Sequence, residues 1–170
     1  RDANPTFCIA HFNSAAFLEV TLHAIRRYHP DARIIVADSR SVWAEYEAAR
    51  TACARFDAEM HPLLAKHRHT GLLNYMFRRI RSETAIYLDQ DCVPLAPLDP
   101  LVAASRSGVL LAGPRDEMWI THPHAGAVHP GLAGGRLRTN PQFIHASLMV
   151  LNAAALKSWI GRAPFRWEAE

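Results

Sequence analysis

Two aspartates, Asp89 and Asp91, flank Gln90 directly after the apolar run Ala85-Ile86-Tyr87-Leu88. A run of this kind predicts a buried β-strand, and side chains two residues apart in a strand point to the same face. Both carboxylates would then lie together at the open end of the strand. Paired oxygen ligands suit Mg²⁺ or Mn²⁺, which binds the phosphates of a nucleotide diphosphate. The alternative is that both are turn or capping residues, but their place after the strongest predicted strand favours a metal site.

Polar residues also follow two other predicted strands. His11-Phe12-Asn13 comes after the apolar run at 6–10, and Asp38-Ser39 comes after the run at 33–37. In an open parallel sheet, ligands bind in the crevice outside the carboxyl ends of the strands. We therefore expect these two turns and the Asp89-Gln90-Asp91 segment to converge on one edge of the sheet.

Asp38 has two interpretations. A carboxylate at a strand end can accept hydrogen bonds from a ribose or from the imino group of uracil. Alternatively, Asp38 caps the helix that is predicted to begin near Val42. The first interpretation makes Asp38 a nucleotide-binding residue and the second makes it structural.

Several histidines are candidates for binding. His67, Arg68, His69 and Thr70 precede a predicted helix, where they can present donors to a phosphate. A solvated turn is an equal alternative for His67 and Arg68. The cluster His122, His124 and His129 lies in a stretch with much of the glycine and proline, and we interpret it as a loop rather than a metal site.

Short apolar runs alternate with helical patterns along the chain, which is typical of βαβ units with a mostly parallel sheet flanked by helices. We therefore expect an α/β fold in a single domain over residues 1–170. Asn13 or Ser14 is the predicted N-cap of the first helix. Residues 113–141 are predicted to form a long loop or lid. The predicted strands are 6–10, 33–37, 59–63 (weak), 85–88, 108–111 and 146–151; the predicted helices are 17–28, 42–56, 71–81, a short one from 101, and 153–160.

The composition is that of an ordinary globular protein. The 170 residues are 49% apolar and 21% charged, which argues against disorder. The formal net charge of +3 suits an anionic small molecule. The charge is too small, and basic runs are too few, for a nucleic-acid partner.

The three cysteines show no CxxC spacing, so we expect neither a zinc ribbon nor a disulfide framework. Such usage indicates a reducing compartment, and we expect a cytoplasmic location. The sequence shows no transmembrane run and no signal-peptide pattern. Because the chain begins at Arg1 rather than Met, we expect either a processed protein or, in preference, a piece cut from a longer one and truncated at its C-terminus. The oligomeric state cannot be read from the sequence.

Four ordered segments resemble family 2 glycosyltransferases of the GT-A (Rossmann-like) fold. Segment 9–14 with Phe17-Leu18 is similar to the family's first strand and "YN" turn, and segment 34–41 to its "IIVVDDGS" motif. Segment 69–74 is similar to the "G-x-x-x-N" helix and segment 85–91 to "YILFLDSDD". The resemblance covers about the first hundred residues, in the expected order.

The resemblance implies transfer of a sugar from a nucleotide diphosphate, helped by Mn²⁺ or Mg²⁺ and usually inverting the anomeric centre. A UDP-sugar is the favoured donor and the acceptor is unknown. Asp91 would be the catalytic residue and direct metal ligand, with Asp89 near the ribose or the metal. The remaining nucleotide-binding residues would be Ala10, Phe12, Asn13, Asp38, His69 and Asn74.

The sequence departs from the family pattern at two places. Asp38-Ser39-Arg40-Ser41 replaces Asp-Asp-Gly-Ser, so one carboxylate and the flexible glycine are missing. The later acidic motif that supplies the general base has no match, and the candidates by charge alone are Asp116, Glu117, Glu168 and Glu170.

Family 8, a retaining GT-A family, provides a weaker second resemblance. The prolines after Asp91 and the segment 143–152, similar to "FNSGVMVIN", carry it. His145 would then be a substrate contact or a late metal ligand, although a turn histidine is the alternative. Two other functions remain open. One is a nucleotidyltransferase, which would normally have a Gly-rich loop after the first strand, where this chain has His11-Phe12-Asn13-Ser14. The other is a degenerate module, which would bind a nucleotide or a partner without catalysis.

Overall fold

The computed structural model describes residues 4–64, 69–109, 111–112 and 148–160, and all structural statements below concern these residues. Their elements alternate between strand and helix over most of the chain. In order they are β1 (Thr6–His11), α1 (Ala15–Tyr28), β2 (Arg33–Asp38), α2 (Trp43–Arg55), β3 (Glu59–Pro62), α3 (His69–Phe77), β4 (Thr84–Asp89), α4 (Asp99–Arg106), β5 (Leu111–Ala112), β6 (Leu148–Asn152) and α6 (Ala153–Ile160).

The strands form one sheet in the order β3-β2-β1-β4-β6-β5. β1, β2, β3 and β4 pair in parallel, whereas β6 runs antiparallel to β4 and to β5. The chain passes from β1 outward to β2 and β3, and then returns through α3 to β4 on the other side of β1. The crevice between β1 and β4 is therefore the switch point, where ligands bind in folds of this kind.

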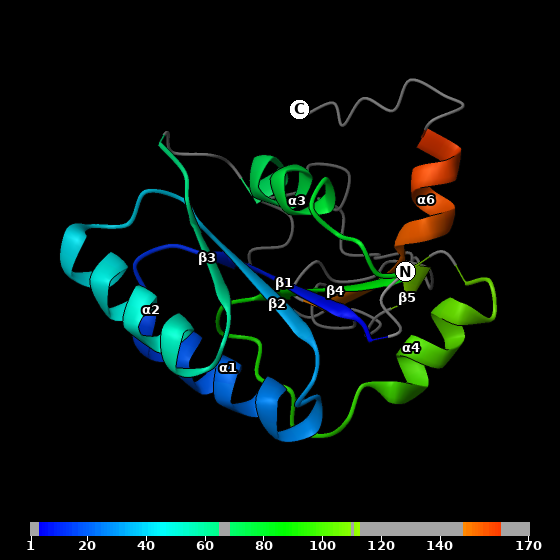
Figure 1. The fold of residues 1–170 in the computed structure, drawn as a ribbon, viewed down its shortest axis with the longest axis horizontal. Coiled ribbons are helices and arrows are strands. Elements are labelled where there is room, and N and C mark those ends of the chain that lie inside the picture. Colours follow the sequence, from blue (N-terminus) through cyan, green and yellow to red (C-terminus); the bar gives the residue numbers. More distant parts are fainter. Residues whose placement is uncertain (1–3, 65–68, 110, 113–147, 161–170) are drawn as a thin grey trace, which may run out of the picture.

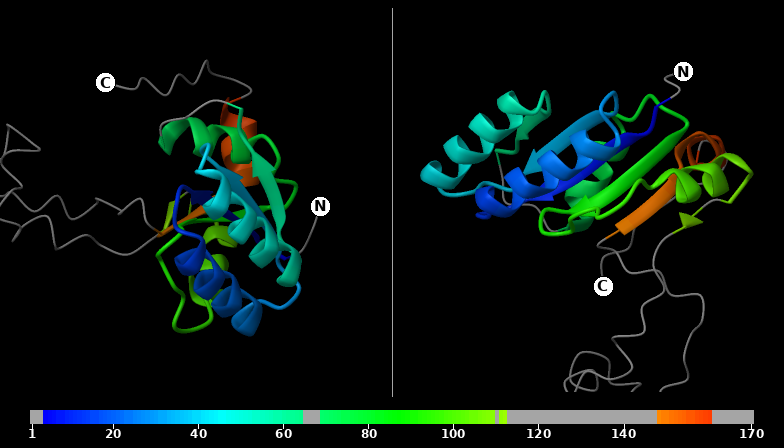
Figure 2. Two further views of the ribbon diagram at one scale, coloured as in Figure 1. Left: turned by 90° about the vertical axis from the view of Figure 1, so that its left-hand side faces the viewer. Right: turned by 90° about the horizontal axis from the view of Figure 1, so that it is seen from below.

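Helices cover both faces of the sheet. α1, α2 and α4 lie on one side, and α3 and α6 lie on the other (Figure 1). Seen from below, α1, α2 and α4 cover the near face (Figure 2, right). The central strands are apolar on both faces because each face is covered. In β1, for example, Phe7 and Ile9 pack in the core under α1 and α2, whereas Cys8 packs in the core under α3.

The predicted α/β fold with a mostly parallel sheet is confirmed, and most of the elements lie where they are predicted. The largest errors are at boundaries. α3 begins at His69 and ends at Phe77, earlier than the predicted 71–81. The strand predicted at 108–111 begins only at Leu111, since Gly108 has a φ of 106° and ends the turn after α4. The predicted loop at 113–141 lies outside the described residues.

The cysteine and membrane predictions can be tested on the same residues. Cys8, Cys53 and Cys92 are all free, and Cys8 is buried in the core as predicted. Burial raises the pKa of the Cys8 thiol far above its ordinary value, so Cys8 stays neutral. No helix in the described ranges combines the length and hydropathy that crossing a bilayer would need.

Candidate active site

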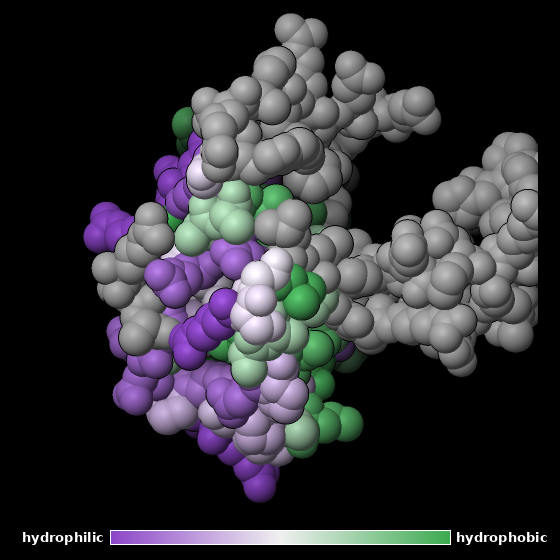
Figure 3. Space-filling view, turned by 90° about the vertical axis from the view of Figure 1, so that its right-hand side faces the viewer, coloured by the Kyte–Doolittle hydropathy of each residue, from purple (hydrophilic) through white to green (hydrophobic). Residues whose placement is uncertain are grey.

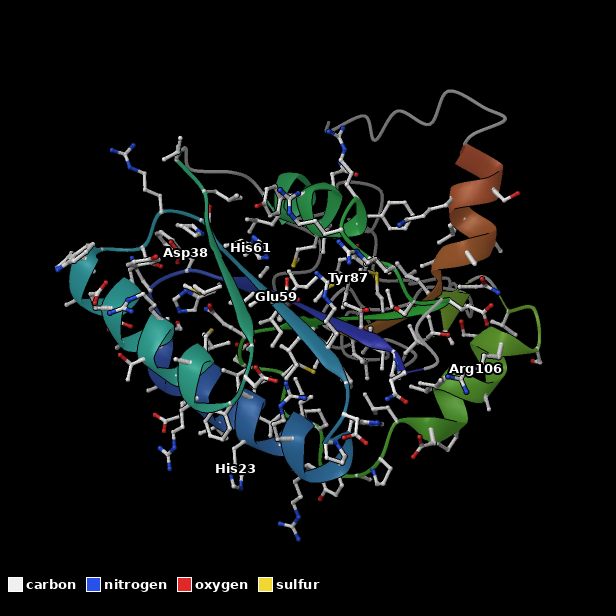
Figure 4. All side chains as sticks on the ribbon, in the orientation of Figure 1. His23, Asp38, Glu59, His61, Tyr87 and Arg106 are labelled. Carbon is white, nitrogen blue, oxygen red and sulfur yellow. The ribbon has the colours of Figure 1, made fainter. Side chains whose placement is uncertain are left out.

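Three turns meet at the carboxyl edge of the sheet, as the sequence predicts. His11 pairs with Asp38 in the register of β1 and β2, and Ala10 pairs with Asp89 in that of β1 and β4. The strand ends are therefore adjacent. Figure 4 shows Asp38 at this edge, at the opposite end of the sheet from Arg106.

The β1–α1 turn is held by hydrogen bonds to the β2–α2 turn. Asn13 has a left-handed backbone with a φ of 49°, a conformation that asparagine tolerates better than most residues. Its N–H donates to Ser41 Oγ at 2.9 Å, and its Oδ1 accepts from the N–H of Val42 at 2.8 Å. Phe12, between His11 and Asn13, has a side chain that is 38% exposed.

The prediction of Asn13 or Ser14 as the N-cap residue of α1 is confirmed for Ser14. Ser14 occupies the N-cap position but makes no side-chain cap hydrogen bond. The Asn13 side chain is bonded to Val42 instead. Glu45, from the first turn of α2, supplies a hydrogen-bond acceptor to the first backbone N–H of α1: its Oε2 accepts from the N–H of Ala15 at 2.9 Å. A carboxylate there stabilises the helix dipole, and it takes the place where an anion would bind.

Asp38 is almost fully buried, at 2% exposure. Its Oδ1 lies 2.8 Å from His11 Nδ1 and accepts from the Ser41 hydroxyl at 2.5 Å, and its Oδ2 accepts from the N–H of Ser41 at 3.0 Å. His11 Nε2 accepts from the N–H of Ser14 at 3.4 Å, so the proton between His11 and Asp38 belongs on Nδ1. This carboxylate therefore holds two turns together.

The alternative that Asp38 caps α2 is wrong, because Val42 is the N-cap residue of that helix. Asp38 bonds Ser41 inside the turn instead. The turn also places Arg40 at a φ of 59°, at the position where the family motif has glycine.

The Asp89–Asp91 pair is arranged differently from the predicted strand pair. β4 ends at Asp89, and the N–H of Cys92 donates to the Asp89 carbonyl at 3.0 Å, which closes a β-turn. Strand alternation therefore does not place Asp91. Burial, and then the charges of Asp89 and Asp91, raise the pKa of the Cys92 thiol that follows them. Asp89 is half-buried and Asp91 is exposed.

Gln90 was not among the predicted site residues, yet it joins two of the turns. Its Oε1 accepts from the N–H of Phe12 at 2.7 Å, and its Nε2 donates to the Phe12 carbonyl at 3.2 Å. Its own carbonyl accepts from the hydroxyl of Thr21, a buried residue of α1, at 2.8 Å. A glutamine between two aspartates carries no sequence signal for these contacts.

The other predicted residues are less closely tied to this edge. His69 begins α3 and Asn74 is half-buried in it, and α3 packs over β1 and β2 on the face opposite α1. Among the described residues, no hydrogen bond joins Asn74 to the three turns. The remaining candidates lie outside the described residues: His67, Arg68, Asp116, Glu117, His122, His124, His129, His145, Glu168 and Glu170.

A divalent ion fits the donor set at the β4 turn. Within the described ranges, no group of three or more His, Cys, Asp or Glu residues is placed to hold a metal. Mg²⁺ commonly keeps several waters and uses one or two carboxylates together with phosphate oxygens. Asp89 and Asp91, with charges near one thiol, supply such a pair.

The chain is similar to known glycosyltransferases. Residues 6–106, more than half of the chain, match glycosyl transferase family 2. None of the curated proteins compared with the chain matches it.

Solved structures share the fold at low sequence identity. A mannosyltransferase from Pyrobaculum calidifontis, solved with GDP-Man and Mn²⁺, has a TM-score of 0.66 and 16% identity, over 94% of this chain and 47% of that one. Glucosyl-3-phosphoglycerate synthase from Mycobacterium tuberculosis, solved with Mn²⁺, UDP and its product, has a TM-score of 0.62 and 16% identity, over 92% and 59%. The galactosyltransferase LgtC, of family 8, has a TM-score of 0.58 and 15% identity, over 95% and 66%. The GT-A fold is thereby confirmed, and the chain spans about half the length of the first of these proteins.

Proposed function

Because the chain belongs to glycosyl transferase family 2, we propose that it forms the donor-binding part of a metal-dependent glycosyltransferase. The enzyme would move a sugar from a nucleotide diphosphate to an acceptor hydroxyl. The observation that carries the proposal is the convergence of the three turns after β1, β2 and β4 at one edge of the sheet. Residues 1–170 would form one domain of this enzyme.

Asp89 and Asp91 would hold the Mn²⁺ or Mg²⁺ ion, with His145 as a further ligand. The bound ion would neutralise charge on the departing diphosphate. Asp91 is exposed and lies at the tip of the β4 turn, so it is the more accessible carboxylate. Asp89 is half-buried between β1 and the turn, which suits a contact to the ribose or the metal.

Ala10, Phe12 and Asn13 would form the wall of the nucleoside pocket between β1 and β4, with His69 and Asn74 contributing from α3. We assign Asp38 to the same pocket, where it would act mainly by fixing the turns. Three hydrogen bonds from His11 and Ser41 already engage its carboxylate. Its affinity for a base or ribose would depend on the single lone pair that remains on Oδ2.

UDP-sugars remain the favoured donors, and transfer with inversion is the expected stereochemistry. The structures of similar fold were solved with GDP-Man or with UDP, so both nucleotides belong in a test. We also propose a cytoplasmic location. The general base that would activate the acceptor is not among the residues assigned here.

Release of nucleoside diphosphate from a panel of UDP- and GDP-sugars, in the presence of Mn²⁺, tests this function. We expect release by the wild type, and at least about a tenfold loss in Asp91→Asn. Asp31→Asn, in the turn before β2 at the amino ends of the strands, is the matched control and should keep the wild-type rate. No release from any donor, with nucleotide binding intact, would instead support a degenerate binding module.

A further inference from the structure

Gln90 is bound to the peptide backbone on both sides of Phe12. The amide accepts from the Phe12 N–H at 2.7 Å and donates to the Phe12 carbonyl at 3.2 Å. Both polar ends of the side chain are therefore used on one residue of the neighbouring turn. These bonds do not depend on the identity of the Phe12 side chain, since only backbone atoms of Phe12 take part.

The backbone of Gln90 is fixed as well. Its carbonyl accepts from the hydroxyl of Thr21, which is 0% exposed in α1. The β-turn closed by Cys92 and Asp89 then surrounds the same residue. A shift of the β4 turn would have to break these bonds or move Phe12 with it.

Phe12 is in turn connected to the β2–α2 turn through its two chain neighbours. Its neighbour His11 is bonded to Asp38, and its neighbour Asn13 donates to Ser41. The peptide segment His11-Phe12-Asn13 is therefore hydrogen-bonded on one side to the β2–α2 turn and on the other to the turn that carries Asp89 and Asp91. The nucleoside side and the metal side of the proposed site are two ends of this network.

We propose that Gln90 is a positioning residue that couples nucleotide binding to metal binding. The inference rests on the function proposed above. A nucleotide that orders the β1–α1 turn would hold the Asp89–Asp91 turn in its metal-binding arrangement through Gln90, and a bound metal would favour the nucleotide equally, because coupling between two binding sites is reciprocal.

The test measures this coupling rather than affinity alone. The dissociation constants of UDP and GDP are determined by calorimetry with and without Mn²⁺, and their ratio is the coupling factor. Gln90→Leu removes both side-chain bonds at similar size, and Gln90→Glu keeps an acceptor for the Phe12 N–H but places a negative charge against its carbonyl. We expect the coupling factor to fall on the order of tenfold in Gln90→Leu, which loses two neutral hydrogen bonds, and similarly in Gln90→Glu, which loses one bond and gains repulsion at the Phe12 carbonyl. Asn4→Ala, at the opposite edge, is the control and should keep the wild-type factor.

Amide hydrogen exchange of the free protein gives a second readout, which needs no ligand. The Phe12 N–H should exchange faster in Gln90→Leu than in the wild type, while amides in the central strands keep their protection. A wild-type coupling factor in both variants would overturn the inference, as would unchanged Phe12 exchange in Gln90→Leu. If the wild type binds neither nucleotide, the coupling and the proposed function both fail, and exchange shows only whether the contact exists in solution. If the wild type binds with metal dependence but the variants retain the coupling, only the inference about Gln90 fails.

Discussion

Arg40 occupies the position at which the family 2 motif has glycine, a residue without a Cβ atom. It has a left-handed φ of 59° and an exposed side chain in the turn between β2 and α2. A non-glycine residue in this conformation costs about 1–2 kcal/mol. Glycine would avoid that cost but would lose about 0.5–1 kcal/mol through the greater freedom of the unfolded chain.

We therefore expect Arg40→Gly to stabilise the protein by about 0.5–1 kcal/mol, because the relief of backbone strain exceeds the entropic loss. The measurement is urea unfolding of the two proteins. Arg40→Ala keeps the penalty for a Cβ and should leave the free energy of unfolding nearly unchanged. A destabilised glycine variant would mean that the Arg40 side chain, rather than its backbone, matters at this position.

For single residues, the sequence predicts which of them lie at the carboxyl ends of the strands better than it predicts how their side chains are arranged there. Asp38, Asp89 and Asn13 lie at the predicted edge because apolar runs of β-branched and aromatic residues define where strands end. The relation between Asp89 and Asp91 was not predictable, since it depends on the β-turn that closes at Cys92. Gln90 could not be predicted because its partners are backbone atoms 78 residues away in the sequence.

At the level of the secondary-structure elements, the side chain of Arg26 connects three segments of the chain. Its Nε donates to the Phe56 carbonyl at 2.7 Å and its Nη2 to the Asp57 carbonyl at 2.7 Å. Its Nη1 donates to the carbonyls of Pro30 and Ala32 at 2.9 and 2.6 Å. One guanidinium thus ties the end of α1 to the α1–β2 turn and to the α2–β3 turn, where Asp57 has a φ of 50°.

Arg26→Met should destabilise the protein by about 2–4 kcal/mol, because several charge-assisted hydrogen bonds to backbone carbonyls are lost together. Chemical denaturation measures the change. The adjacent Arg27 is exposed, and Arg27→Met should shift stability by less than about 0.5 kcal/mol. Equal effects of the two substitutions would show that the Arg26 contacts add nothing to stability.

The edge strand β3 is joined to β2 by an ion pair. Arg33 Nε lies 2.5 Å from Glu59 Oε1, and Arg33 Nη2 lies 2.8 Å from Glu59 Oε2. The hydrogen bonds from Arg33 hold the pKa of the Glu59 carboxyl below its ordinary value of 4.5. Because the folded-state pKa is depressed, the pair contributes stability above the unfolded pKa and loses it as the pH falls through the folded pKa.

Glu59→Gln should therefore flatten the loss of stability on acidification below about pH 4.5, compared with the wild type. Urea unfolding at a series of pH values measures this slope. In an Arg33→Gln background the same substitution should have a smaller effect, since only His61, whose Nε2 lies 3.5 Å from Glu59 Oε2, is then left as a partner. A Glu59→Gln slope equal to that of the wild type would contradict the account.

The sequence predicts the elements well because alternating apolar runs and helical periodicity are local signals. It does not predict pairing direction. β6 lies antiparallel between β4 and β5, although its apolar residues resemble those of the parallel strands. The hydrogen-bond acceptor at the N-terminus of α1 was not predictable for a related reason, since Glu45 comes from another helix.

On the scale of the whole molecule, the described part is a layered α/β domain with one edge of turns. Figure 3 shows hydrophilic residues over much of the described surface on the right-hand side of Figure 1, with hydrophobic residues among them. The chain spans about half of the mannosyltransferase with which it shares the fold.

Calorimetric titration of UDP and GDP into the protein, with and without Mn²⁺, tests the central claim most directly. We expect at least one nucleotide to bind more strongly with Mn²⁺ than without it, and this gain to fall by at least about tenfold in Asp91→Ala. Asp31→Ala removes the same charge at the opposite edge and should bind as the wild type does. Binding that ignores Mn²⁺, or a metal effect that survives in Asp91→Ala, would contradict the account.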